Sequence, residues 1–107
     1  MTSGQDGPSA TVEVRSDTSG ALTLAIAGEL DLASVGPVHA AIDEAVDGGR
    51  KQLVFDLGDL TFMDSSGIAM MLKISKEVDS MVLRNVTPIV RRVIEVTGLV
   101  DVLGLDP

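Results

Sequence analysis

The sequence alternates between two hydrophobic periodicities, and this alternation restricts the chain to a small set of folds. Residues 11–15 alternate apolar and polar side chains, as a half-buried strand does, and residues 21–30 read as a second strand. Only a short turn at residues 17–20 separates the two segments, so we predict that they pair as an antiparallel hairpin.

Three later segments have the apolar spacing of helices. Each begins at residues that favour helix starts, and the first and third end at glycine. These helices are expected from Asp31 or Ser34 to the glycines of residues 47–49, from Ser65 or Ser66 onward, and over residues 87–97, where Thr87 and Pro88 form the start and Gly98 the end.

Two more strands are expected between these helices. Residues 52–57 are almost continuously apolar, which is typical of a central strand covered on both faces. Residues 58–63 read as a connection, and residues 81–86 read as the last strand. The tail, residues 99–107, has room for one short strand or turn.

The resulting order is β-β-α-β-α-β-α, in which strands alternate with helices after an opening hairpin. Such an order predicts an α/β fold: a mixed, mostly parallel sheet with helices packed against it and right-handed crossovers. The length of 107 residues fits one domain, expected over residues 11–107. Residues 1–10 lack the basic and apolar regions of a secretory signal and read as a disordered lead.

Composition excludes several functions. Cysteine is absent, so disulfides and thiolate sites are excluded, and no apolar run approaches the ~20 residues that span a bilayer. The net charge of −8 disfavours nucleic acid and anionic membranes as partners and favours a basic protein surface. In the alternative interpretation, this charge only keeps the domain soluble. With two Phe and no Tyr or Trp, base stacking on single strands is not expected.

Enzyme chemistry has little support in the residue types. His39 is the only histidine and falls at a polar position of the first helix, where we expect a solvated surface side chain. A histidine–carboxylate metal site and a serine–histidine–aspartate triad are therefore not expected, and no glycine-rich phosphate loop is present. We expect no cofactor, no metal and no enzymatic activity.

The segment Asp64-Ser65-Ser66-Gly67 allows two interpretations. In the first, Asp64 or a serine caps the helix and Gly67 permits close packing. In the second, a hydroxyl exposed at the helix start, beyond the carboxyl end of a strand, accepts a phosphate. Local sequence does not decide between them.

Longer stretches resemble a known family. Residues 54–68 (VFDLGDLTFMDSSGI) are similar to the signature of the STAS domain, most of all in single-domain bacterial anti-sigma factor antagonists. Residues 28–31 (GELD) resemble the turn after the second strand of that family, and residues 87–99 (TPIVRRVIEVTGL) resemble its third helix. The three segments occur in the family's order and identify the domain at residues 11–107 as STAS-like.

The resemblance implies a cytoplasmic, partner-switching regulator of transcription. An anti-sigma factor with serine kinase activity binds the unmodified chain and releases its sigma factor. Phosphorylation of Ser65, with Ser66 as the second choice, blocks that binding, and a PP2C-type phosphatase reverses it. ATP and magnesium belong to the kinase in this scheme. The partner-binding residues implied by the same matching are Asp31, Asp64, Ser65, Ser66, Gly67, Ile68 and Met71.

Two departures from the family pattern stand out. The second helix is about one turn shorter than usual, because residues 75–80 run straight into the next strand. The C-terminal strand and helix of the family are reduced to residues 100–105 or absent, which favours either self-association, as a weak homodimer, or lower stability. Alternative functions are a STAS scaffold subunit of a stress-signalling complex and a soluble accessory subunit of an ABC lipid transporter; an enzyme is the weakest alternative.

Overall fold

The computed structural model describes residues 9–16, 20–46 and 52–103. Several expectations fall on residues outside the described ranges: the lead expected to be disordered (apart from residues 9 and 10), most of the expected hairpin turn, the expected glycine end of the first helix and the last four residues of the tail. No helix formed by the described residues has both the length and the apolar character needed to cross a membrane.

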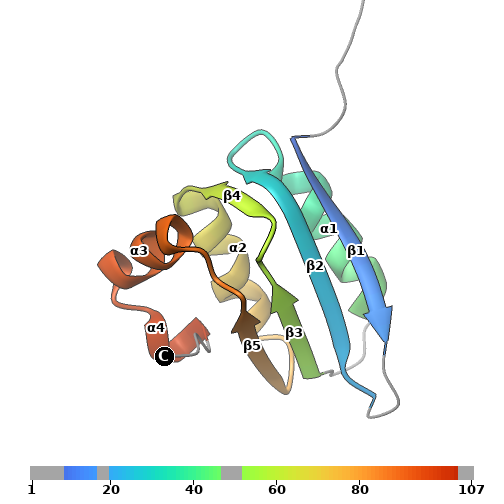
Figure 1. Ribbon diagram of the computed structural model, residues 1–107. Helices are drawn as coiled ribbons and strands as arrows, with labels where there is room; N and C mark the ends of the chain where they lie inside the picture. Colours follow the sequence, from blue (N-terminus) through green and yellow to red (C-terminus); the bar gives the residue numbers. More distant parts are fainter. Residues whose placement is uncertain (1–8, 17–19, 47–51, 104–107) are drawn as a thin grey trace, which may run out of the picture.

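The five described strands form one mixed sheet (Figure 1). Antiparallel pairing joins the first two strands, and every other pairing is parallel, so the predicted fold class is confirmed. The order across the sheet is β1-β2-β3-β5, and β4 continues beyond β3 along the same side of β2. The strands are β1 (Ala10–Ser16), β2 (Leu22–Leu30), β3 (Gln52–Asp56), β4 (Leu60–Met63) and β5 (Ser80–Arg84).

Strand β4 falls in the segment that the sequence predicted as a plain connection. Its buried residues, Leu60 and Met63, are three positions apart, whereas a regular strand buries every second residue. The pairing with β2 shifts register between Gly28 and Glu29, so one extra residue of β4 bulges out. The bulge turns both buried side chains to the same face. It also removes the period-two alternation by which a strand is recognised in a sequence.

Four helices complete the described fold: α1 (Val35–Val46), α2 (Ser65–Ser75), α3 (Pro88–Thr97) and α4 (Val100–Leu103). The predicted start of α3 is confirmed, because the Thr87 side chain accepts a hydrogen bond from Val90 N, and Gly98 ends the helix at φ 75°. The tail was predicted as a strand or turn, and α4 corrects this. Its Leu103 is fully buried and closes the core beside α2 and β5.

The helices α1 and α2 lie together on one face of the sheet (Figure 1). The residues of β2 and β3 that point toward them, such as Leu24 and Phe55, are fully buried. Residues of the opposite face, such as Ala25 and Val54, are only half-buried, and no described helix crosses β1, β2 and β3 there. The expectation that the central strand is covered on both faces is therefore wrong, because no described helix packs over its second face.

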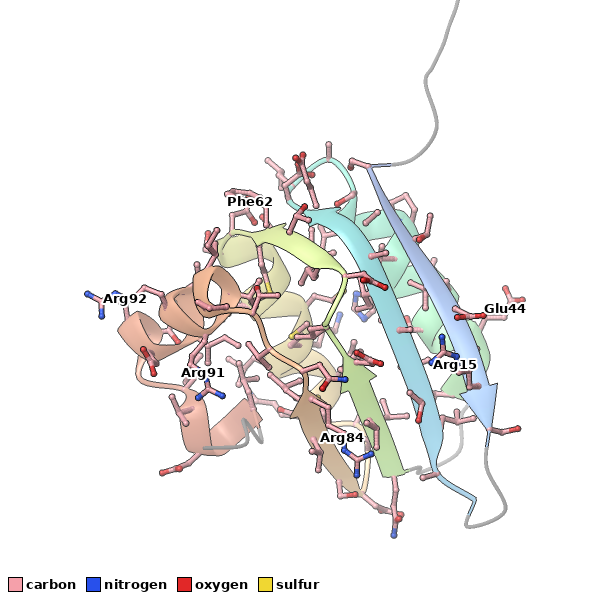
Figure 2. All side chains as sticks on the ribbon, in the orientation of Figure 1. Arg15, Glu44, Phe62, Arg84, Arg91 and Arg92 are labelled. Carbon is pink, nitrogen blue, oxygen red and sulfur yellow. The ribbon has the colours of Figure 1, made fainter. Side chains whose placement is uncertain are left out.

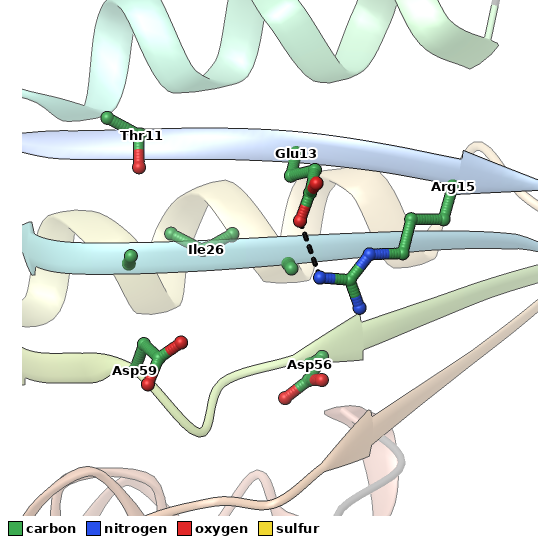
Figure 3. A pocket seen from close by; sticks show the side chains of 8 residues that line it. Thr11, Glu13, Arg15, Ile26, Asp56 and Asp59 are labelled. Carbon is green, nitrogen blue, oxygen red and sulfur yellow. Dashed lines mark hydrogen bonds and ion pairs between the residues drawn. The ribbon is translucent and has the colours of Figure 1, made fainter.

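Charged side chains lie on this open face, with Arg15 and Arg84 on either side of β2 and β3 (Figure 2). A shallow hollow between β1 and β3 contains Glu13, Arg15 and Asp56, and Arg15 donates to Glu13 (Figure 3). Small alanine side chains of β2 form its floor.

Asp56, at the end of β3, is held by the turn that follows it. Its Oδ1 accepts hydrogen bonds from Gly58 N and from Asn85 Nδ2, each at 3.1 Å. Asn85 has a left-handed backbone (φ 57°), which asparagine tolerates better than most residues. The Gly58 and Asn85 hydrogen bonds, and then the charges of Arg15 and Arg84, lower the pKa of Asp56.

Close packing at the start of α2 depends on Gly67. A Cβ at this position would lie 2.6 Å from Met63 Cγ and 3.0 Å from Leu30 Cδ2, so neither strand end leaves room for it. Gly36, in the first turn of α1, has no such neighbours.

We expect Gly67→Ala to lower the free energy of unfolding by about 1–3 kcal/mol, because the added methyl group overpacks the core. Gly36→Ala is the matched control; it should raise the free energy of unfolding by about 0.5–1 kcal/mol through helix propensity. Urea unfolding monitored by circular dichroism measures both. Equal effects of the two substitutions would contradict the packing role of Gly67.

Asn85→Gly should raise the pKa of Asp56 toward its ordinary value, because it removes an amide donor while leaving the left-handed backbone unstrained. A pKa that is lowered in the folded state stabilises the fold above about pH 4 and stops doing so as pH falls through the folded value. The variant should therefore lose less stability than the unmodified protein on acidification. NMR titration of the Asp56 carboxyl carbon measures the shift, and an unchanged pKa would contradict the prediction.

Candidate functional site

The carboxyl ends of β2 and β4 lie side by side, and a helix begins shortly after each. Leu30 pairs with Met63, and the next residues along the two chains are Asp31 and Asp64. A hydrogen bond from Asp64 N to Leu30 O, at 3.2 Å, joins the two segments. The structure therefore brings together the two aspartates that the sequence singled out 33 positions apart.

Asp64 caps α2. Its backbone is extended (φ −108°, ψ −170°), and its side chain accepts a hydrogen bond from Ser66 N at 2.8 Å. Its carbonyl oxygen accepts from Gly67 N and Ile68 N, which closes the first turn. Ser65 is thus the first helical residue and is exposed, whereas Ser66 is half-buried. The capping interpretation of this segment is confirmed.

Asp31 closes the turn that precedes α1. Its Oδ1 accepts hydrogen bonds from Ala33 N at 3.1 Å and Ser34 N at 3.0 Å. The hydroxyl of Ser34 accepts from Asp31 N and donates to Glu29 O at 2.7 Å. These bonds hold the loop between β2 and α1 in one shape beside the start of α2.

Three of the residues singled out by the sequence lie in the interior. Gly67, Ile68 and Met71 are buried, and Met71 has no exposed surface. Their side of α2 packs on the sheet, so they support the helix start and do not themselves present a surface to a partner.

Two exposed apolar side chains at this end of the molecule escaped the sequence reasoning. Leu32 is 79% exposed, and it lies within the capped loop after β2. Phe62 is 44% exposed, pairs with Glu29 in register, and lies at the end of β4 (Figure 2). Leu32 is an apolar residue between Asp31 and Ser34, and this was a usable sequence signal for its exposure. The exposure of Phe62 was hidden by the bulge in β4.

A shallow groove runs between α1 and α2 and reaches the start of α2. Its lining includes Ser66 at one end, the apolar Val35, Ala69 and Met70, and Lys73. His39 also lines this groove, so its half-buried side chain, 23% exposed, corrects the expectation of a solvated surface histidine.

His39 also has acidic neighbours that the sequence did not predict. Its Nε2 lies 3.6 Å from Asp43 Oδ1, and the donor atoms of His39, Asp43 and Glu77 all lie within 4.8 Å of one another. Such a set of one imidazole and two carboxylates is chemically able to ligate a divalent cation. Both carboxylates are exposed, however, and exposed acidic groups commonly gather without an ion, so the grouping does not define a metal centre.

Comparisons with known sequences agree with this geometry. The STAS domain family profile matches residues 10–107. An anti-sigma F factor antagonist from Paenibacillus polymyxa is 32% identical over 93 residues, which cover 80% of this chain and 78% of the relative. An anti-sigma F factor antagonist from Lysinibacillus sphaericus is 34% identical over 77 residues, which cover 67% and 66%, respectively.

Solved structures are similar over most of the chain. An anti-sigma factor antagonist from Mycobacterium paratuberculosis matches with a TM-score of 0.78 and 29% identity, over 92% of this chain and 86% of that one. The anti-sigma factor antagonist SpoIIAA in its unphosphorylated form matches with a TM-score of 0.75 and 27% identity, over 90% and 86%. Phosphorylated SpoIIAA of Bacillus matches with a TM-score of 0.67 and 25% identity, over 91% and 92%. With the family profile spanning nearly the whole described fold, this chain belongs to the STAS domain family.

Proposed function

We propose that this chain is an anti-sigma factor antagonist whose binding to an anti-sigma factor is switched off by phosphorylation of Ser65. The observation that carries the proposal is the exposed position of Ser65 at the first residue of α2, directly after its Asp64 cap. The names of the similar proteins support the partner class, and one similar structure is of a phosphorylated antagonist.

Accessibility favours Ser65 over Ser66 as the phosphate acceptor. A kinase must bring the serine hydroxyl against the γ-phosphate of ATP, which requires that side chain to project into solvent. Ser65 is exposed, whereas Ser66 is half-buried and its N–H is held by Asp64. In this scheme the anti-sigma factor supplies the serine kinase with its ATP and magnesium, a PP2C-type phosphatase reverses the reaction in the cytoplasm, and this chain catalyses nothing.

A phosphate at Ser65 acts without unfolding the domain. The start of α2 carries the positive end of the helix dipole, which tolerates a phosphate well. The modification adds about −1.5 to −2 charges to a chain whose net charge is already −8. An anti-sigma factor would then have to desolvate or contact this charge, so repulsion and lost hydroxyl contacts weaken binding.

Apolar side chains supply the docking energy in this proposal. Leu32 and Phe62 extend from the loop after β2 and from the end of β4, the two segments that also carry Asp31 and Asp64. Exposed apolar residues rimmed by polar ones are typical of protein interaction sites. Their position makes a phosphate at Ser65 a neighbour of the contact surface and explains how one charge controls docking.

Substitutions of Ser65 test the switch. Ser65→Ala should bind the anti-sigma factor of the same organism like the unmodified protein, yet take up no phosphate from it. Ser65→Asp should weaken binding about tenfold or more, because it places a permanent charge at the helix start. Calorimetry without ATP measures binding, and mass spectrometry after incubation with ATP and magnesium locates the phosphate.

Ser66→Ala is the control for this experiment and should be phosphorylated at the normal rate. Phosphate found on Ser66 or elsewhere would refute the assignment of Ser65. Full binding by the Ser65→Asp variant would refute the electrostatic mechanism.

Alanine substitutions test the apolar contacts. Leu32→Ala and Phe62→Ala should each weaken binding to the unphosphorylated chain about tenfold, the effect typical of a central interface residue. Val96→Ala is the matched control, because Val96 is 69% exposed but lies on α3. Thermal melting verifies that each variant is folded, and unchanged affinities in folded Leu32→Ala and Phe62→Ala would place the docking surface elsewhere.

A further inference from the structure

Strand β1 forms an edge of the sheet that faces away from the proposed docking site. Among the described strands it pairs only with β2, whereas β4 and the start of α2 lie on the other side of β2 (Figure 1). Most of β1 is exposed, including Glu13, Val14 and Arg15. An exposed strand edge offers a row of backbone donors and acceptors to another strand.

The hydrogen bonds of β2 show which β1 residues face outward. Glu29 N donates to Ser9 O, so this antiparallel pair is hydrogen-bonded, and Gly28 N instead donates to Asp59 O on the other side. Because hydrogen-bonded pairs alternate along an antiparallel ladder, the odd-numbered residues of β1 turn their backbone groups toward β2. The even-numbered residues Val12, Val14 and Ser16 turn theirs outward.

We propose that two copies of this chain associate through antiparallel pairing of their β1 strands, with the two-fold axis at Val14, to form one continuous sheet. Val14 of one copy then pairs with Val14 of the other, and Val12 pairs with Ser16 of the other. All three are the outward-facing residues, so each of these pairs can exchange two backbone hydrogen bonds.

Charge complementarity selects this register. With the axis at Val14, Glu13 lies directly opposite Arg15 of the second copy, and Arg15 lies opposite its Glu13. Moving the axis by one residue places either Glu13 opposite Glu13 or Arg15 opposite Arg15, and like charges directly opposite are destabilising. An axis at Val12 places Glu13 opposite Thr11 and forms no charge pair. The Glu13–Arg15 contact within one chain thus becomes half of a ring of four alternating charges.

The other face of the junction is apolar. Val14 is 47% exposed and lines a shallow groove between β1 and α1 together with Ala41 and Ala45. Pairing would cover this groove with the same side chains of the second copy. Glu44 lies at the same edge (Figure 2), and its like charge across the axis, with the net charge of −8, opposes association. The dimer is therefore weak and depends on the charge ring.

Charge reversal tests the register. Glu13→Arg and Arg15→Glu alone should each raise the dimer dissociation constant about tenfold or more, because each creates two facing pairs of like charge. The double variant, Glu13→Arg with Arg15→Glu, restores opposite charges and should return to within about threefold of the unmodified protein. Sedimentation velocity over a concentration series measures the constants, and circular dichroism verifies folding. A protein that stays monomeric at every concentration, or single variants that dimerise normally, would overturn the proposal.

Crosslinking provides a second test, because the chain contains no cysteine. In a hydrogen-bonded antiparallel pair the Cα atoms lie about 5.5 Å apart, within the range that a disulfide can bridge. Val14→Cys should therefore form a disulfide-linked dimer under mild oxidation about tenfold faster than Ser16→Cys, whose two copies lie about 13 Å apart in the proposed register. Rates are normalised to the alkylation rate of each thiol, and equal normalised rates would overturn the register.

Discussion

The parallel pairing of β2 with β4 is the contact on which the rest of the site depends. It places Leu30 beside Met63 and, through the hydrogen bond from Asp64 N to Leu30 O, sets two capped loops next to each other. The start of α2 packs so closely against Leu30 and Met63 that only a glycine fits at position 67. The proposed docking surface, including the exposed serine, lies at this junction.

A helix cap and the proposed phosphorylation switch would use the same chemistry at this junction. Asp64 satisfies one of the backbone donors at the start of α2, and the remaining positive potential at that end is well suited to a phosphate on Ser65. The fold has no need to rearrange when the charge appears. Regulation in the proposed scheme therefore acts on the partner, through desolvation and repulsion at a rigid surface.

Packing both α1 and α2 on one face of the sheet has a further consequence. The opposite face keeps its charged residues, and the carboxylate of Asp56 is held by Gly58 and Asn85 at the end of β3. Among the described strands, the edge strand β1 pairs on one side only, with β2, and the alternating charges of Glu13 and Arg15 favour the proposed register between two copies. The proposed docking surface and the proposed dimer edge thus lie on opposite sides of β2.

The sequence by itself determined the order of all elements except β4 and α4, the mixed sheet and the helix starts, because capping residues and apolar periodicity act over a few neighbouring positions. It also placed Ser65 at a helix start. Only the tertiary structure decided that β4 is a strand, that Phe62 is exposed and that His39 is half-buried between α1 and α2. The bulge in β4, the one-sided coverage of the sheet and the burial of α4 arise from contacts between segments distant in sequence, and no local pattern encodes such contacts.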